Sequence, residues 1–203
     1  MGKYFGTDGF RGEANVDLTV EHAYKVGRYL GWYYSQNGKA KVVIGKDTRR
    51  SSYMFEYALV SGLTASGADV YLLHVTTTPS VSYVVTSEEF DCGIMISASH
   101  NPYYDNGIKI LDGNGHKMDA GVENLIEQYI DGLIDELPYA TKDEIGCALD
   151  YSIGRNRYIG YLMSIPTRAF RNYRVGLDCA NGASSAIAKS VFDALGAKTY
   201  VIN

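Results

Sequence analysis

Features that would place the sequence in several large classes of protein are missing from it. No segment approaches the roughly 18 uninterrupted apolar residues that a membrane-spanning helix needs. The three cysteines, Cys92, Cys147 and Cys179, are odd in number and widely spaced, which suits neither a disulfide framework nor a zinc site. The N-terminus has no apolar stretch like the centre of a signal peptide. We therefore expect a cytoplasmic protein with reduced thiols and no membrane partner.

An excess of positive charge is also missing. The formal net charge is −4 and the pI is about 5.5. A protein that binds nucleic acid is expected to carry a basic face, so we expect no nucleic-acid partner. A local positive site for a phosphate stays compatible with this charge, because net charge averages over patches.

Strand-like apolar segments alternate with segments of helical periodicity along most of the chain. The expected strands cover 41–46, 69–75, 92–97 and 107–111, and the expected helices cover 19–37, 51–66, 80–88 and 119–136. This alternation predicts a three-layer α/β/α domain with a mixed, mostly parallel sheet. Ligands of such sheets bind beyond the carboxyl ends of the strands, where we expect the segments 45–50, 97–106 and 6–12.

The chain divides near residue 150, in a polar and irregular segment over 138–155 that precedes a helix over 155–164. We expect one domain over 1–150 and the start of a second over 151–203. VVIGKD, a helix and SGADVYLLHV are echoed by VGLD, a helix and LGAKTYVIN, which indicates a duplicated β–α–β unit or a chance likeness between two such units. A lone β–α–β unit buries little core, so we expect the chain to be a fragment.

The segment ISASHNPYYDNGIKI (96–110) places concentrated polar chemistry between two strands. Pro102 biases the residue before it away from helix, so the loop turns and exposes the hydroxyl of Ser99. One interpretation is a plain turn with a hydroxyl bonded to its own backbone. The other is a phosphoryl carrier, which needs cations such as Lys109 nearby. A hydrolase is disfavoured, because no G-x-S-x-G motif occurs and the neighbouring side chains of Ser99 and His100 are expected to point apart.

The segment FGTDGFRG (5–12) combines glycines with Arg11 near the start of the chain. Glycine lets the backbone approach a ligand closely, and arginine can bind phosphate with two hydrogen bonds. A simple turn with an exposed arginine would have the same composition. The glycine-rich segment is therefore a weak signal by itself.

Taken together, FGTDGFRG, GKDTRRSS, SASHNPYYDNGIK and DCANGASS occur in an order that resembles the α-D-phosphohexomutase family, most closely its bacterial phosphoglucosamine mutases. The resemblance implies that Ser99 carries a phosphoryl group and donates it to glucosamine 6-phosphate. The product, glucosamine 1,6-bisphosphate, then returns its other phosphate and leaves glucosamine 1-phosphate, for the synthesis of UDP-N-acetylglucosamine and the cell wall. The substrate would be a phosphorylated amino sugar.

The resemblance also implies roles for individual residues. Catalytic roles fall on Ser99, Lys109, Arg11 and His100. Contacts to the substrate or its phosphate fall on Thr7, Arg11, His100, Asn101 and Lys109. Lys109 and Arg11 would steady the phosphoryl group and act as general acid and base. Asp47 and Arg49 are expected to be structural and to hold the loops together.

Mg²⁺ would be held by the phosphate on Ser99 and by aspartates of a DGDxDR loop, and no such sequence occurs in these residues. The other metal ligands would then lie beyond Asn203, as would the loops that select the sugar and grip its phosphate. We therefore expect the 203 residues alone to be inactive. The resemblance also implies a homodimer for the complete protein. The alternatives are a phosphomannomutase or phosphoglucomutase, and a non-catalytic domain that binds a partner or a phosphosugar.

Overall fold

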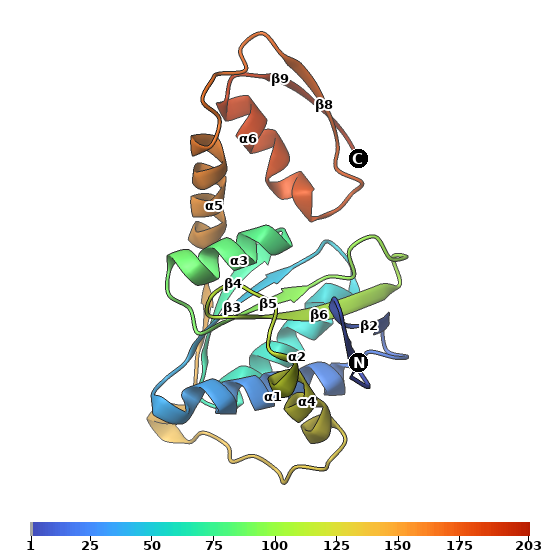
Figure 1. Cartoon of the computed structure of the whole chain (residues 1–203), viewed down its shortest axis with the longest axis vertical. Coiled ribbons are helices and arrows are strands. Elements are labelled where there is room, and N and C mark those ends of the chain that lie inside the picture. Colours follow the sequence, from blue (N-terminus) through green and yellow to red (C-terminus); the bar gives the residue numbers. More distant parts are fainter. Residues whose placement is uncertain (1) are drawn as a thin grey trace.

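A seven-stranded sheet forms the centre of the protein in the computed structural model, which describes residues 2–203 (Figure 1). In spatial order its strands are β1 (Phe5–Gly6), β2 (Gly9–Glu13), β6 (Asp105–Asp112), β5 (Cys92–Ile96), β3 (Lys41–Lys46), β4 (Asp69–Val75) and β7 (Ala148–Asp150). The neighbouring strands β5, β3, β4 and β7 are parallel. By contrast, β6, β2 and β1 run antiparallel to their neighbours, so the sheet is mixed, as the sequence predicts.

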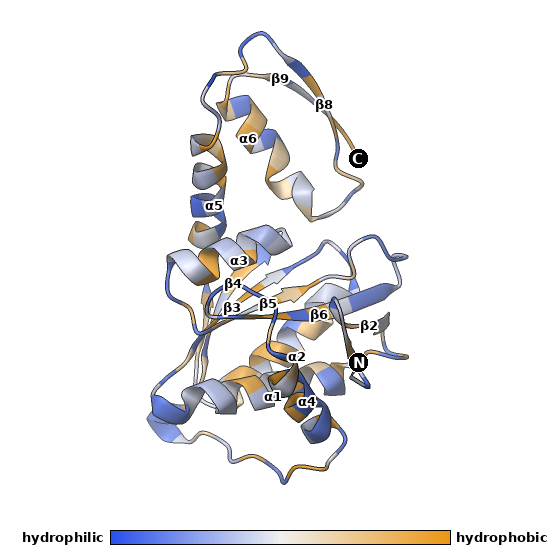
Figure 2. Cartoon of the chain, in the orientation of Figure 1, coloured by the Kyte–Doolittle hydropathy of each residue, from blue (hydrophilic) through white to orange (hydrophobic). Residues whose placement is uncertain are grey.

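Helices cover both faces of this sheet. One face carries α1 (Val20–Tyr34), α2 (Ser51–Ala65) and α4 (Ala120–Ile130), and the other carries α3 (Thr78–Ser87) (Figure 1). Alternate residues of β3 point to opposite faces, so Val42 and Ile44 enter the core under α1 and α2 while Val43 enters a smaller core under α3. Hydrophobic residues gather where α1, α2 and α4 meet (Figure 2). The predicted three-layer α/β/α architecture is confirmed.

Some element boundaries differ from those predicted. The helix expected over 119–136 ends at Ile130, because Gly132 takes a left-handed φ of 72° that stops the helix. The segment expected to be irregular contains β7, and α5 (Ser152–Ser164) begins earlier than predicted. A strand as short as β7 has too few residues to show a periodic pattern, so the sequence carries no signal for it.

A second β–α–β unit follows α5. It consists of β8 (Arg174–Asp178), α6 (Ala188–Ala194) and β9 (Lys198–Ile202), and its two strands pair in parallel. The β3–α2–β4 segment has the same element order and the same parallel pairing, in agreement with the sequence echo. A duplication and the domain boundary near residue 150 stay predictions. Within residues 2–203, no helix is long and apolar enough to cross a membrane.

The close crossing of α1 and α2 depends on two glycines. A Cβ atom at Gly62 would lie 2.3 Å from the carbonyl oxygen of Tyr24, and one at Gly27 would lie 2.5 Å from that of Leu59. Both distances are far below van der Waals contact with backbone atoms, which cannot move aside as a flexible side chain can. The two helices therefore touch backbone to backbone, and this contact fixes α2 against α1.

The N-terminal segment is a β-hairpin and not the loop expected over residues 6–12. β1 and β2 pair through a two-residue turn of Thr7 and Asp8, and β2 pairs with β6. Gly9 has φ 91°, and a Cβ atom there would lie 2.4 Å from the carbonyl oxygen of Ile108. Gly9 therefore serves strand pairing at the sheet edge, a role that composition alone does not distinguish from ligand binding.

Glu127 on α4 anchors the start of this hairpin. Its carboxylate accepts hydrogen bonds from the backbone N–H groups of Lys3, Tyr4 and Phe5 at 2.7–2.9 Å. Burial acts to raise the pKa of Glu127, but the three backbone donors outweigh burial and hold the pKa below its ordinary value of 4.5. The lowered pKa means that the folded protein stabilises the ionised form of Glu127. The contribution of Glu127 to stability is therefore fully present above pH 4.5 and is lost as the pH falls through the lowered pKa.

Gly62→Ala should destabilise the protein, because the added methyl group must push two helix backbones apart. We expect a loss of about 1–3 kcal/mol in the free energy of unfolding. Gly160→Ala is the matched control, since Gly160 lies in α5 with nothing within 4 Å of the added Cβ, and it should leave stability unchanged or raised. Urea unfolding of both variants tests this, and equal stabilities would contradict the close crossing.

Glu127→Gln should flatten the acid dependence of stability. We expect the variant to lose about 1–3 kcal/mol at neutral pH, where the charged acceptor is most effective. The difference from the unsubstituted protein should shrink as the pH falls below about 4, because protonation then removes the same charge. The control is Asp135→Asn at an exposed position. Parallel stability curves for Glu127→Gln and the unsubstituted protein between pH 3 and 7 would refute the anchor.

Candidate active site

Ser99 lies where the sequence places it, in the loop after the carboxyl end of β5. Its side chain is exposed and its φ is +55°, a left-handed conformation that is uncommon outside glycine. Such a backbone costs on the order of 1–3 kcal/mol and persists only where surrounding contacts hold it. The neighbouring loop after β3, which contains Asp47 and Arg49, supplies those contacts.

The expectation that Asp47 and Arg49 hold the loops together is confirmed. Arg49 donates a hydrogen bond from Nε to Asp47 Oδ2 at 3.3 Å and one from its terminal nitrogen to the carbonyl oxygen of Ser99 at 2.9 Å. Both side chains are only 10% exposed. The mostly buried ion pair therefore holds Arg49 in the loop after β3, and Arg49 joins this loop to the loop after β5.

The expectation that the side chains of Ser99 and His100 point apart is wrong. Ser99 Oγ lies 3.3 Å from His100 Nδ1, because the left-handed backbone at Ser99 turns the two side chains toward each other. Within residues 2–203, no carboxylate hydrogen-bonds to His100, so the pair is not part of a hydrolase triad. The arrangement lets the imidazole exchange a proton with the serine hydroxyl.

Asn101 serves the loop itself. Its Nδ2 donates to Asp105 Oδ2 at 2.9 Å, which closes the loop before β6 begins. The fully buried Asn106 then donates to the hydroxyls of Ser51 and Ser52 at the start of α2, at 2.8 and 3.1 Å. The Ser99 loop is thus tied to α2 at its C-terminal side.

Arg11 and Lys109 form a second group with Asp8. In the antiparallel pairing of β2 and β6, Arg11 stands opposite Gly107, two residues from Lys109, so both cations lie on the same face of the sheet. Asp8 bridges them, with Oδ2 2.9 Å from the guanidinium and Oδ1 3.5 Å from the Lys109 ammonium. Thr7, Asp8 and Lys109 line a cavity of about 190 Å³.

The Ser99 group faces a different and larger cavity. Ser99, His100 and Asn101 line a space of about 510 Å³ together with Asp47 and Arg49, closed on one side by the turn Ala180–Gly182. Thr48 Oγ1 donates to the carbonyl oxygen of Asn181 at 2.8 Å and so connects this turn to the first loop. Ser99 and Lys109 do not line a common cavity among the described residues.

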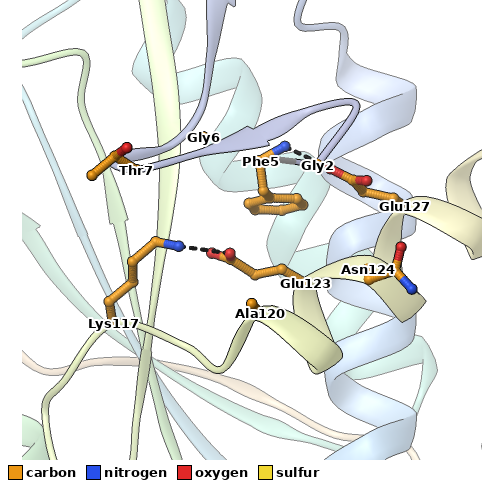
Figure 3. A pocket seen from close by; sticks show the side chains of 9 residues that line it. All are labelled: Gly2, Phe5, Gly6, Thr7, Lys117, Ala120, Glu123, Asn124 and Glu127. Atoms are coloured by element: carbon orange, nitrogen blue, oxygen red, sulfur yellow. Dashed lines mark hydrogen bonds and ion pairs between the residues drawn. The ribbon is translucent and has the colours of Figure 1, made fainter.

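Thr7 lies between the Lys109 cavity and a third cavity of about 420 Å³, which is shown in Figure 3. There Lys117 donates to Glu123 Oε2 at 2.6 Å, and Glu127 holds the backbone of Phe5 from the other side. Because these carboxylates are already engaged by a lysine and by backbone donors, the wall beside Thr7 is preformed.

The predicted site residues therefore fall into two groups, and each contains a residue that the sequence reasoning missed. Asp8 bridges the two cations, and Asn181 closes the Ser99 cavity. Both lie inside the motifs FGTDGFRG and DCANGASS, so the motifs marked the right segments. Their contacts depend on strand register and on the packing of distant loops, which no local pattern shows.

Comparison with known proteins identifies the family. The family described as phosphoglucomutase/phosphomannomutase, alpha/beta/alpha domain I, matches residues 2–135. The chain is 72% identical over 203 residues to a phosphoglucosamine mutase of Lachnoclostridium phytofermentans, and 70% identical over 206 residues to one of Lachnospira eligens. Each alignment covers 100% of this chain but only 45% or 46% of the relative, so the chain spans about half the length of the curated relatives it matches.

A solved structure shares the fold. A phosphoglucomutase/phosphomannomutase family protein of Burkholderia thailandensis superposes with a TM-score of 0.81 at 24% identity, over 100% of this chain and 44% of the other. The family resemblance predicted from the four motifs is confirmed. The chain belongs to the phosphoglucomutase/phosphomannomutase family, whose α/β/α domain I it contains.

Proposed function

We propose that the complete protein is a phosphoglucosamine mutase, which interconverts glucosamine 6-phosphate and glucosamine 1-phosphate through a phosphoserine at Ser99. One observation carries the proposal: an exposed serine hydroxyl is held in a left-handed loop beyond the carboxyl end of β5, facing a cavity of about 510 Å³. Strand ends of this kind are where α/β sheets bind ligands. The names of the relatives that are 72% and 70% identical supply the amino-sugar substrate.

In the proposed reaction, a hydroxyl oxygen of glucosamine 6-phosphate attacks the phosphorus on Ser99. The new O–P bond forms as the bond between phosphorus and Ser99 Oγ breaks, which gives glucosamine 1,6-bisphosphate and a free serine. After the intermediate reorients, Ser99 Oγ attacks the phosphorus of the 6-phosphate as the bond between that phosphorus and the sugar oxygen breaks. The sugar oxygen takes up the proton that the serine hydroxyl gives up, and glucosamine 1-phosphate is released. His100 Nδ1, 3.3 Å from Ser99 Oγ, is placed to hold the proton of the free hydroxyl between the two steps.

Arg11 and Lys109 supply the positive charge in this proposal. Phosphoryl transfer depends mainly on positioning and charge stabilisation, which suits two cations on one face of the sheet. Their side chains are only 20% and 21% exposed, whereas that of Asp8, which bridges them, is 61% exposed. Asp8 thus keeps the cations in place and partly neutralises them until an anionic substrate competes for them. Thr7 and Asn101 are proposed to complete the substrate contacts.

In this proposal, phosphorylated Ser99 is the one residue of the described chain that would contribute a ligand to Mg²⁺. No group of three or more His, Cys, Asp or Glu side chains within the described residues could hold a metal ion. The chain would therefore contribute a phosphate oxygen on Ser99, and the aspartates implied by the resemblance would come from elsewhere in the complete protein. When bound, the metal would neutralise charge on the transferring phosphoryl group. The homodimer is proposed from the resemblance, and the cytoplasmic location from the resemblance together with the odd number and wide spacing of the cysteines.

A phosphoglucomutase or phosphomannomutase is the second candidate. It is favoured by the description of the matching family, which names both activities. The chemistry at Ser99 would be the same, and only the sugar would differ. Assays of the complete protein with glucosamine, glucose and mannose 6-phosphates separate the candidates, and we expect the amino sugar to react fastest.

Ser99→Ala in the complete protein should abolish mutase activity, because no hydroxyl remains to carry the phosphoryl group. We expect a loss of at least about 1,000-fold in kcat with glucosamine 6-phosphate. Ser61→Ala, which removes an exposed hydroxyl on α2, is the control and should keep full activity. A Ser99→Ala variant that keeps turning over substrate would sink the proposed function.

Asp8→Asn should strengthen binding of a phosphate anion, because it removes a negative charge between two cations. We expect affinity for inorganic phosphate at low salt to rise by roughly fivefold, with stability almost unchanged because exposed ion pairs contribute little. Calorimetric titration of the 203-residue chain measures the affinity, and thermal unfolding measures the stability. Asp135→Asn is the control for the loss of one exposed charge, and equal affinities for the two variants would show that Arg11 and Lys109 do not receive the phosphate.

A further inference from the structure

The guanidinium of Arg49 is hydrogen-bonded to several backbone carbonyl oxygens of the Ser99 loop. It donates hydrogen bonds at 2.5–2.9 Å to four carbonyl oxygens, which belong to Ser99, Asn101, Pro102 and Asp105. A fifth hydrogen bond runs from Nε to Asp47 Oδ2 at 3.3 Å. Guanidinium donors lie in one rigid plane, so this set of acceptors fixes the course of the whole loop.

The N–H of Ser99 is held by the same ion pair through a serine. Ser97 Oγ accepts from the backbone nitrogen of Ser99 at 3.0 Å and donates to Asp47 Oδ2 at 3.0 Å. Ser97 and Asp47 are both buried. Asp47, Ser97, Ser99 and Arg49 therefore form a closed ring of hydrogen bonds, in which both backbone polar groups of Ser99 are engaged.

This ring has an electrostatic consequence at Ser99. A phosphoserine carries nearly two negative charges, and carbonyl oxygens facing it would repel it. Here the carbonyl oxygens of the loop turn toward a cation instead, while the Ser99 side chain faces the cavity. The same contacts hold the left-handed backbone of Ser99, which does not persist unaided.

We propose that Arg49, Asp47 and Ser97 form a positioning device that fixes the backbone of Ser99 so that its oxygen stays aligned for phosphoryl transfer in both its phosphorylated and its free state. The device makes and breaks no covalent bond, and the guanidinium donors of Arg49 are already engaged by protein acceptors. It should therefore act on the transfer step and leave substrate binding alone. This inference rests on the proposed function of Ser99.

Arg49→Lys in the complete protein tests the device, because lysine keeps the charge but lacks the planar set of donors. We expect kcat with glucosamine 6-phosphate to fall about 10–100-fold, as small misplacements of a reacting group do, while KM stays within about threefold. Single-turnover transfer from phosphorylated Ser99 should slow by the same factor. Arg50→Lys is the matched control, since Arg50 is the adjacent arginine, is exposed, and has no hydrogen-bond partner in residues 2–203.

Ser97→Ala is a second variant, which removes only the link between the Ser99 N–H and Asp47. It should lower kcat about 3–10-fold, and the double variant should lose less than the product of the two single losses, because both remove parts of one ring. Thermal melting shows whether each variant is folded, and if Arg49→Lys does not fold, Ser97→Ala decides.

The experiments distinguish a failure of the positioning role from a failure of the proposed mutase function. Turnover in Ser99→Ala overturns the proposed function. If Ser99→Ala is inactive but Arg49→Lys matches Arg50→Lys, or if a folded Ser97→Ala keeps full kcat, the positioning device is wrong. A rise in KM with unchanged kcat in Arg49→Lys would also overturn it, because Arg49 would then bind substrate.

Discussion

The mostly buried ion pair between Asp47 and Arg49 lies in the loop after β3 and is hydrogen-bonded to Ser97 and Ser99 in the loop after β5, and the candidate site depends on this junction. Two parallel strands bring the loops to the same edge of the sheet, but pairing alone does not shape them. Arg49 and Ser97 engage the two polar backbone groups of Ser99, so a residue with a strained backbone is held in place within an exposed loop. The strain at Ser99 is thus balanced locally, by groups that the β3–β5 pairing places beside it.

A second constraint fixes the cations. Arg11 lies on β2, and β2 stays in the sheet through its pairing with β6 and through the hairpin that Glu127 anchors from α4. Lys109 lies on β6 itself, so the relative position of the two cations is set by strand register. The two groups of site residues are therefore linked by β6, which starts at the end of the Ser99 loop and continues to Lys109. A shift of β6 would move both groups.

The sequence predicted the layers, most strands and the segments that carry the site, because hydrophobic period and turn residues are local. It also predicted that Asp47 and Arg49 would join loops. It did not predict the hairpin over Phe5–Glu13, since glycines that serve close strand pairing look like glycines that serve a ligand. The contact between Ser99 and His100 was wrongly excluded, because a left-handed serine leaves no mark in the sequence. The bridging role of Asp8 follows from register, which only the folded sheet defines.

The measurement that tests the account most directly is the location of phosphate on the complete protein after incubation with glucosamine 1,6-bisphosphate. Peptide mass spectrometry after digestion identifies the modified residue. The account predicts one phosphate, on Ser99, which exchanges with the phosphates of the sugar when glucosamine 6-phosphate is added, because each turnover passes it to the sugar and then restores the phosphoserine. Phosphate on a different residue, or mutase activity in a protein whose Ser99 stays unmodified throughout, would contradict it.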